Sequence, residues 1–183
     1  SFLILFGACT EEFEEINTNP NVPLQVPANL LLPGIIRSVS NQLESESWGI
    51  GNVVVQHTAK IQFVNEDRYL WGEFNGIWNT YYTKLREVNN ILVISRANGQ
   101  KNYEGVALVM KSFMFSVLTD TYGDVPYSEA TSGKTGEFFP KYDTQEEIYA
   151  GILADLATAN QLLGTTTEQL QGDILFNGDV NKW

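Results

Sequence analysis

Two consecutive apolar stripes constrain the fold of this 183-residue chain more than any other feature. Apolar side chains recur at spacings of three and four along residues 77–92, and again along residues 103–118. That spacing matches one face of an α-helix, so each segment is predicted to be an amphipathic helix. Asn98 and Gly99 stand between the segments and predict a helix stop. Because the link is short, the two helices are predicted to form an antiparallel hairpin.

Two less regular segments precede this hairpin. Residues 30–46 are predicted to form a helix that Pro33 and Gly34 interrupt early. Residues 50–63 are also predicted to be helical, although the valines at 53–55 would suit a strand equally well.

A further helix is predicted over residues 144–163. It opens at Thr144 with Glu147 three residues on, which is the spacing of a capping box. Its apolar stripe consists of Ile148, Ile152, Leu153, Leu156, Ala159 and Leu163. No alternating segment predicts a strand, so the fold class is all-α. Hairpins in series with long loops predict a tetratricopeptide-like arrangement, although no strict repeat is visible, and we expect it to be incomplete at both ends.

The beginning of the chain has the pattern of an export signal. Residues 2–6 are apolar, Gly7 and Ala8 follow, and Cys9 is the single cysteine of the chain. Residues 1–8 are therefore predicted to be the tail of a signal peptide, and residues 6–9 resemble a bacterial lipobox with Cys9 as the acylated residue. The alternative is a buried first strand with an incidental cysteine.

The segment after Cys9 is predicted to be a lipidated, extended tether spanning residues 9–28. Three prolines within residues 17–27 keep that stretch extended. Four glutamates within residues 11–15 resemble the signal that sends lipoproteins of Bacteroidetes-type bacteria to the cell surface. The alternative is that these glutamates only solvate the tether.

The charge balance excludes several kinds of partner. The chain has 22 acidic and 11 basic residues, for a net charge of −11. Nothing in that balance would neutralise nucleic-acid phosphates or an anionic membrane surface, so neither is an expected partner. One cysteine and one histidine exclude a Cys/His metal cluster, and we expect no metal or cofactor. His57 lies in a predicted helix and is interpreted as structural.

A polar and aromatic loop between predicted helices, residues 63–78, is the candidate ligand site. Sugars bind by stacking their C–H faces on aromatic rings while amide, carboxylate and guanidinium groups bond to their hydroxyls. The candidate contacts in this loop are Asn65, Arg68, Tyr69 and Trp71, with Trp48 in another loop. The alternative is that these aromatic residues fill the gap between helices.

Five stretches, in order along almost the whole chain, have the pattern of one protein family. The most specific is Leu118-Thr-Asp-Thr-Tyr-Gly-Asp-Val-Pro-Tyr127. The others are Asn17-Thr-Asn-Pro-Asn21; Trp78-Asn-Thr-Tyr-Tyr82 with Asn89-Asn-Ile91; Ile148 to Ala159; and Gly178-Asp-Val-Asn-Lys-Trp183. Together they resemble the SusD/RagB family of outer-membrane nutrient-binding lipoproteins, in which the first of these stretches is similar to the end of a helix.

The resemblance implies a helical scaffold of tetratricopeptide-like units. It implies a lipoprotein anchored in the outer membrane and facing outward. Such a protein captures oligosaccharides, or peptides in some branches, and delivers them to a SusC-like TonB-dependent transporter. Family members are much longer, so residues 29–183 are expected to be the amino-terminal part of the helical domain. Much of the ligand site would then lie in a missing carboxy-terminal part.

Two other functions remain open from the sequence. The helical repeats could serve protein contacts as a scaffold. A surface glycosidase would need a carboxylate pair, for which Asp120 and Asp124 are the candidates. Carboxylates that stabilise turns are far commoner, so no catalytic residue and no enzymatic activity are expected.

Overall fold

The computed structural model describes residues 26–136 and 138–183, and within them the chain is mainly helical. The long helices are α2 (Ala28–Glu46), α4 (Gly76–Asn98), α5 (Lys101–Tyr122) and α6 (Gln145–Leu162). A π-helical turn (Ser47–Gly51) and the short α3 (Asn52–Val54) extend α2. Single 3₁₀ turns occupy Glu66–Arg68, Ser132–Thr135 and Val180–Lys182. No strand occurs in the described residues, so the all-α prediction is confirmed.

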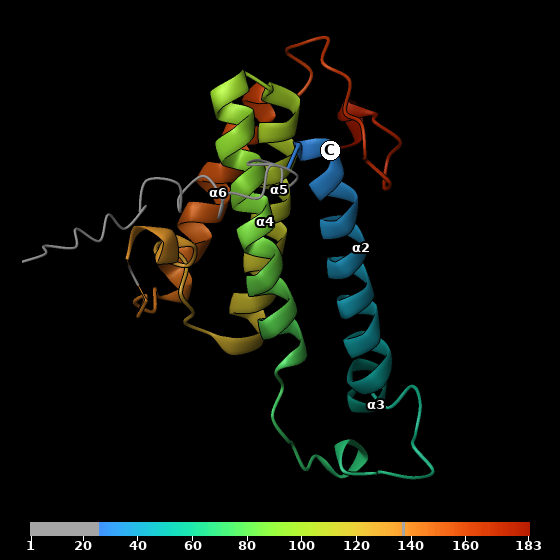
Figure 1. Cartoon of the computed structure of the whole chain (residues 1–183). Helices are drawn as coiled ribbons and strands as arrows, with labels where there is room; N and C mark the ends of the chain where they lie inside the picture. Colours follow the sequence, from blue (N-terminus) through green and yellow to red (C-terminus); the bar gives the residue numbers. More distant parts are fainter. Residues whose placement is uncertain (1–25, 137) are drawn as a thin grey trace, which may run out of the picture.

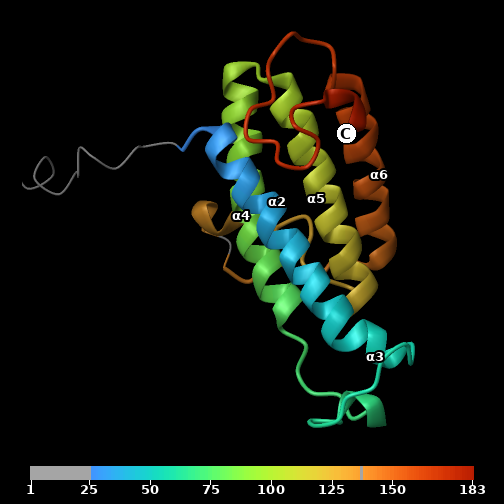
Figure 2. The ribbon, with the colours of Figure 1, turned by 90° about the vertical axis from the view of Figure 1, so that its right-hand side faces the viewer.

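The long helices lie side by side, and each packs on the next (Figure 1). α2 packs on α4, α4 on α5, and α5 on α6, and successive helices run in opposite directions (Figure 2). α4 and α5 form the predicted antiparallel hairpin. Gly99 closes the short link between the two helices and Gly123 follows the last residue of α5, and their φ angles of 67° and 78° suit a residue without a Cβ.

The core runs through all four long helices, between α2 and α4, between α4 and α5, and between α5 and α6. On α4 the predicted stripe is buried through Ile77, Tyr81, Leu85, Val88, Ile91 and Leu92. Facing it are Leu32, Ile35, Ile36 and Val39 of α2 and a longer row on α5. Among the described residues, no member of this buried core cluster comes from positions 40–76.

Two predictions near the beginning are wrong. α2 continues through Pro33, because the buried side chains on both sides of Pro33 hold the helix against α4 despite one missing hydrogen bond. The helix predicted over residues 50–63 ends at Val54, since this part extends beyond the end of the bundle and has no helix to pack on. His57 is therefore exposed in a turn and not inside a helix.

α6 keeps its predicted capping box, in which Thr144 Oγ1 accepts from Glu147 N and Glu147 accepts from Thr144 N. Its apolar stripe is only partly buried. Ile148, Ile152 and Ala159 face α5, whereas Leu153 is 65% and Leu156 38% exposed. The apolar spacing predicted the helix correctly, but it predicted more buried side chains than the structure has.

Two stretches that resemble the SusD/RagB family pack directly against each other. The ring of Trp78, at the start of α4, meets the ring of Tyr122, at the end of α5, edge to face with centroids 5.3 Å apart. Tyr82 donates a hydrogen bond to the carbonyl oxygen of Pro126 at 2.7 Å. The start of α4 is thereby fixed to the link that leaves α5.

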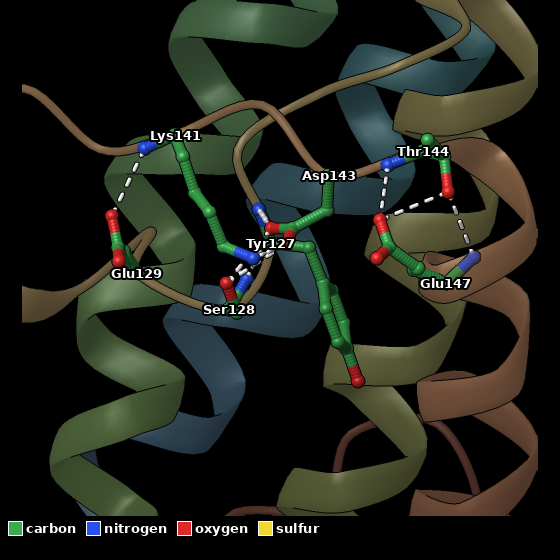
Figure 3. A network of polar contacts seen from close by, with 7 residues as sticks. All are labelled: Tyr127, Ser128, Glu129, Lys141, Asp143, Thr144 and Glu147. Carbon is green, nitrogen blue, oxygen red and sulfur yellow. Dashed lines mark hydrogen bonds and ion pairs between the residues drawn. The ribbon is translucent and has the colours of Figure 1, made fainter.

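The link between α5 and α6 is organised by one buried carboxylate, Asp143 (Figure 3). It accepts hydrogen bonds from the backbone nitrogens of Tyr127 and Ser128 at 2.9 and 2.7 Å, and from the Ser128 hydroxyl. Lys141 pairs with it at 2.9 Å. Burial alone would raise the pKa of Asp143, but these hydrogen bonds and the Lys141 ammonium together lower the pKa to about 2.

Replacing Asp143 with Asn is expected to destabilise the protein by about 2 kcal/mol at neutral pH, because the amide puts a donor opposite backbone donors and the ion pair is lost. The folded-state pKa of Asp143 lies below its ordinary value of 3.8. Its contribution is therefore present above about pH 4 and is lost as the pH falls towards 2.

Urea unfolding at about pH 7 and about pH 3 measures this effect. The difference in unfolding free energy between wild type and Asp143→Asn should be smaller at the lower pH. Glu44→Gln, which removes an exposed carboxylate of α2, is the control, and its difference in unfolding free energy from wild type should be the same at both pH values. Equal stability of Asp143→Asn and wild type at neutral pH would contradict the assigned role.

Candidate functional site

The candidate ligand-binding residues lie in the segment that connects α2 to α4, residues 47–75, called here the distal segment. It extends past the end of the helical bundle, away from the first residues of α2 (Figures 1 and 2). The sequence predicted Trp48 in a separate loop, but Trp48 lies in the π-helical turn that continues α2. All five candidate residues are therefore in one connection.

The interior of the distal segment is held by a few polar contacts. The Lys60 backbone nitrogen donates to Asp67 Oδ1 at 3.0 Å, and the Lys60 ammonium pairs with Glu66 at 2.7 Å. The hydrogen bond from Lys60 lowers the pKa of Glu66. Gln56 Nε2 donates to the Tyr69 hydroxyl at 3.2 Å. These contacts join the outgoing and returning arms of the segment.

The backbone of the distal segment is strained at three residues that are not glycine. Gln56, Phe63 and Tyr69 have φ angles of 59°, 54° and 55°. A side chain in this left-handed region costs about 1 to 2 kcal/mol relative to the right-handed region. Such strained residues concentrate at ligand-binding and active sites, where the strained geometry aims a side chain. Tyr69 is both strained and a predicted ligand contact.

The predicted aromatic contacts are on the surface. Trp48, Tyr69 and Trp71 are 72%, 50% and 53% exposed, so none of them fills the core between helices. Tyr69 and Trp71 meet edge to face with ring centroids 6.0 Å apart. Asn65 and Arg68 are exposed on the same loop. Within the described residues no ring contact joins Trp48 to this pair. The other four candidate residues are close because they are neighbours in the sequence, and Trp48 stands apart from them.

Further apolar side chains on the distal segment escaped the sequence analysis. Ile61 and Phe63 are 98% and 88% exposed. The sequence predicts a helix over residues 50–63, in which a partner would cover these two side chains.

Asp120 and Asp124 are engaged in the fold at the end of α5. Asp120 Oδ1 accepts from the Tyr149 hydroxyl at 2.8 Å, and Asp124 Oδ1 accepts from Gln145 N at 3.0 Å. Each joins the end of α5 to the start of α6. Both therefore have a structural role as turn-stabilising carboxylates.

The remaining predicted features concern the membrane and metals. Cys9 and the tether up to residue 25 lie outside the described residues. Over residues 26–136 and 138–183, no helix is long and apolar enough to cross a membrane. In the same ranges, no three His, Cys, Asp or Glu side chains gather as metal ligands would.

Replacing Asp67 with Ala should loosen the distal segment without unfolding the bundle, because it removes the acceptor for the Lys60 backbone nitrogen. One such hydrogen bond contributes about 1 kcal/mol, so exchange of the Lys60 amide should accelerate about fivefold. Hydrogen exchange followed by NMR measures this rate. Glu73→Ala removes an exposed carboxylate whose partner is the Asn75 side chain, and serves as the control. Unchanged exchange at Lys60 in Asp67→Ala would contradict the contact.

Comparison with known proteins identifies relatives of this fold. The model of a SusD-like family, described as "Starch-binding associating with outer membrane", matches residues 20–183. No curated protein matches the sequence at a significant level. Two solved SusD homologues from Bacteroides fragilis are each 26% identical, with TM-scores of 0.68 and 0.70.

A candidate outer-membrane nutrient-binding protein from Bacteroides vulgatus is 29% identical, with a TM-score of 0.66. The matches cover 86% or 87% of this chain but only 33% of each of these three solved chains. The chain thus spans about one third of the length of its solved relatives. Since the family model covers nearly the whole sequence, this chain belongs to the SusD-like family of outer-membrane-associated proteins.

Proposed function

We propose that the protein binds oligosaccharides at the outer membrane and that the distal segment supplies part of the ligand site. The observation that carries the proposal is the pair of exposed rings, Tyr69 and Trp71, on a loop that also exposes Asn65 and Arg68. Ring faces pair with the C–H faces of a sugar, and the amide and guanidinium groups can donate to its hydroxyls. The description of the family model as starch-binding supports the same ligand class.

Trp48 is proposed as a further contact for a longer glycan. It is more exposed than the other two rings, and it lies on the same connection between α2 and α4. A chain of several sugar units could reach both positions, whereas a single sugar would contact the Tyr69–Trp71 pair alone. Peptide remains the alternative ligand, because ring faces and planar polar groups also accept side chains and backbone amides.

The proposal includes how the protein is held and what receives the ligand. Acylation at Cys9 would anchor it in the outer membrane, with the helical domain outside the cell. The lipobox-like residues 6–9 and the membrane association of the family support this part. The ligand would pass to a SusC-like TonB-dependent transporter. Catalysis is not proposed, because Asp120 and Asp124 have structural partners and the family is one of binding proteins.

Trp71→Ala is expected to weaken binding to a soluble glycan about tenfold, because it removes one stacking face of the paired rings. Affinity electrophoresis against soluble starch, β-glucan, mannan and xylan would select the glycan, and calorimetry would measure its affinity. Phe138→Ala, which removes an exposed ring outside the distal segment, should bind like wild type.

Equal affinity of Trp71→Ala and wild type for every glycan that binds would place the ligand elsewhere on the protein. Retention of a peptide library with no glycan bound would favour the peptide alternative. Release of reducing ends from a bound polysaccharide would support the glycosidase hypothesis. Binding of neither ligand class would favour the scaffold function.

A further inference from the structure

A second concave site lies at the opposite end of the bundle from the distal segment. It is a cavity of about 400 Å³ between the start of α2, the end of α4, the start of α5 and residues 168–171. That volume falls within the usual range for small-ligand clefts. None of the ligand contacts proposed above lines it.

The wall formed by residues 164–171 is fixed by two buried residues of α5. The Asn102 side chain donates to the carbonyl oxygen of Glu168 at 2.9 Å and accepts from Gly164 N at 3.0 Å. Asn102 N donates to a Glu168 carboxylate oxygen at 3.0 Å. The Tyr103 hydroxyl donates to the carbonyl oxygen of Gln171 at 2.9 Å. Asn102 and Tyr103 are 1% and 4% exposed, so these bonds hold the wall from its buried side.

The cavity is lined by side-chain amides that make no hydrogen bond with any described residue. These amides belong to Asn29, Asn98, Gln100, Gln169 and Gln171. Each amide offers two donors and an acceptor side by side. Among the described residues that line the cavity, none is lysine or arginine, and Glu168 is the charged one. An anionic ligand therefore has no counter-charge there.

We propose that this amide-lined cavity binds a small polyhydroxylated ligand, a mono- or disaccharide, through its hydroxyl groups. A pair of adjacent hydroxyls both donates and accepts, which matches the donor and acceptor of one side-chain amide. An added peptide strand fits less well, because the described residues around the cavity offer no strand edge.

The composition of the cavity also determines how such a ligand would bind. The aromatic side chain in the lining, Tyr103, is buried and its hydroxyl is already bonded, so no ring face is available for stacking. Without stacking, hydrogen bonds exchanged against water give weak binding, in the millimolar range. Because no ion pair forms, the affinity should not change with salt. The inference does not depend on the distal segment and would stand if that site bound no glycan.

The test uses the protein carrying Trp71→Ala, so that the distal site contributes less. Its side-chain amide resonances are followed by ¹⁵N NMR during titration with maltose, cellobiose and xylobiose to tens of millimolar. Asn98→Leu and Gln100→Met remove single amides of similar shape and assign their resonances. The expected result is a saturating shift of the Asn98 and Gln100 amide resonances with at least one disaccharide, unchanged by added salt.

A variant that combines Asn98→Leu, Gln100→Met and Gln169→Met should abolish the remaining shifts. Gln161→Met, which removes an exposed amide of α6 outside the cavity, should leave them intact. The proposal is overturned if none of the three disaccharides shifts these resonances. It is equally overturned if Gln161 shifts as much as Gln100, or if only a capped tripeptide produces the shift.

Discussion

The position of the distal segment on the bundle depends on the contacts that Tyr122 makes with the start of α4. The Tyr122 hydroxyl donates to the carbonyl oxygen of Phe74 and accepts from Trp78 N, while its ring meets the Trp78 indole. Since the distal segment ends at residue 75, this one side chain fixes the point where that segment rejoins the bundle. Asp143 acts similarly in the connection that leads from Tyr122 to α6, where it accepts hydrogen bonds from the backbone of Tyr127 and Ser128. Trp78, Tyr82 and Tyr122, which lie in stretches that resemble the family, therefore fix connections between helices.

The two proposed sites lie at opposite ends of α2 and differ in chemistry. At an α-helical rise of 1.5 Å per residue, the 19 residues of α2 separate them by about 28 Å. The distal segment offers exposed rings and a guanidinium, whereas the other end offers amides on a wall that buried Asn102 and Tyr103 hold. The packed core of the helices lies between them, and neither proposed site shares a residue with the other.

The sequence correctly predicted the helices whose apolar face packs against neighbouring helices. The predictions for α4 and α5 were correct because each helix packs on helices at both flanks, so most of its apolar face is buried, although Phe113 of α5 is 41% exposed. The helix predicted over residues 50–63 was wrong from residue 55 on because the apolar side chains there lie beyond the bundle. Apolar spacing alone does not stabilise a helix that has no surface to pack on. Pro33 was misread because packing of α2 on α4 outweighs one lost hydrogen bond. The exposed rings could be predicted from composition. The amide-lined cavity could not, because its residues are separated by up to 142 positions and only the fold brings Asn29 beside Gln171.

The buried core cluster has no member between Val39 and Ile77 within the described chain. Substitutions in the distal segment consequently cost the bundle little folding free energy. Selection can alter the rings, charges and length of that segment while the scaffold stays above its stability threshold. The ligand contacts proposed for the distal segment can therefore diverge among related proteins while the four long helices stay the same.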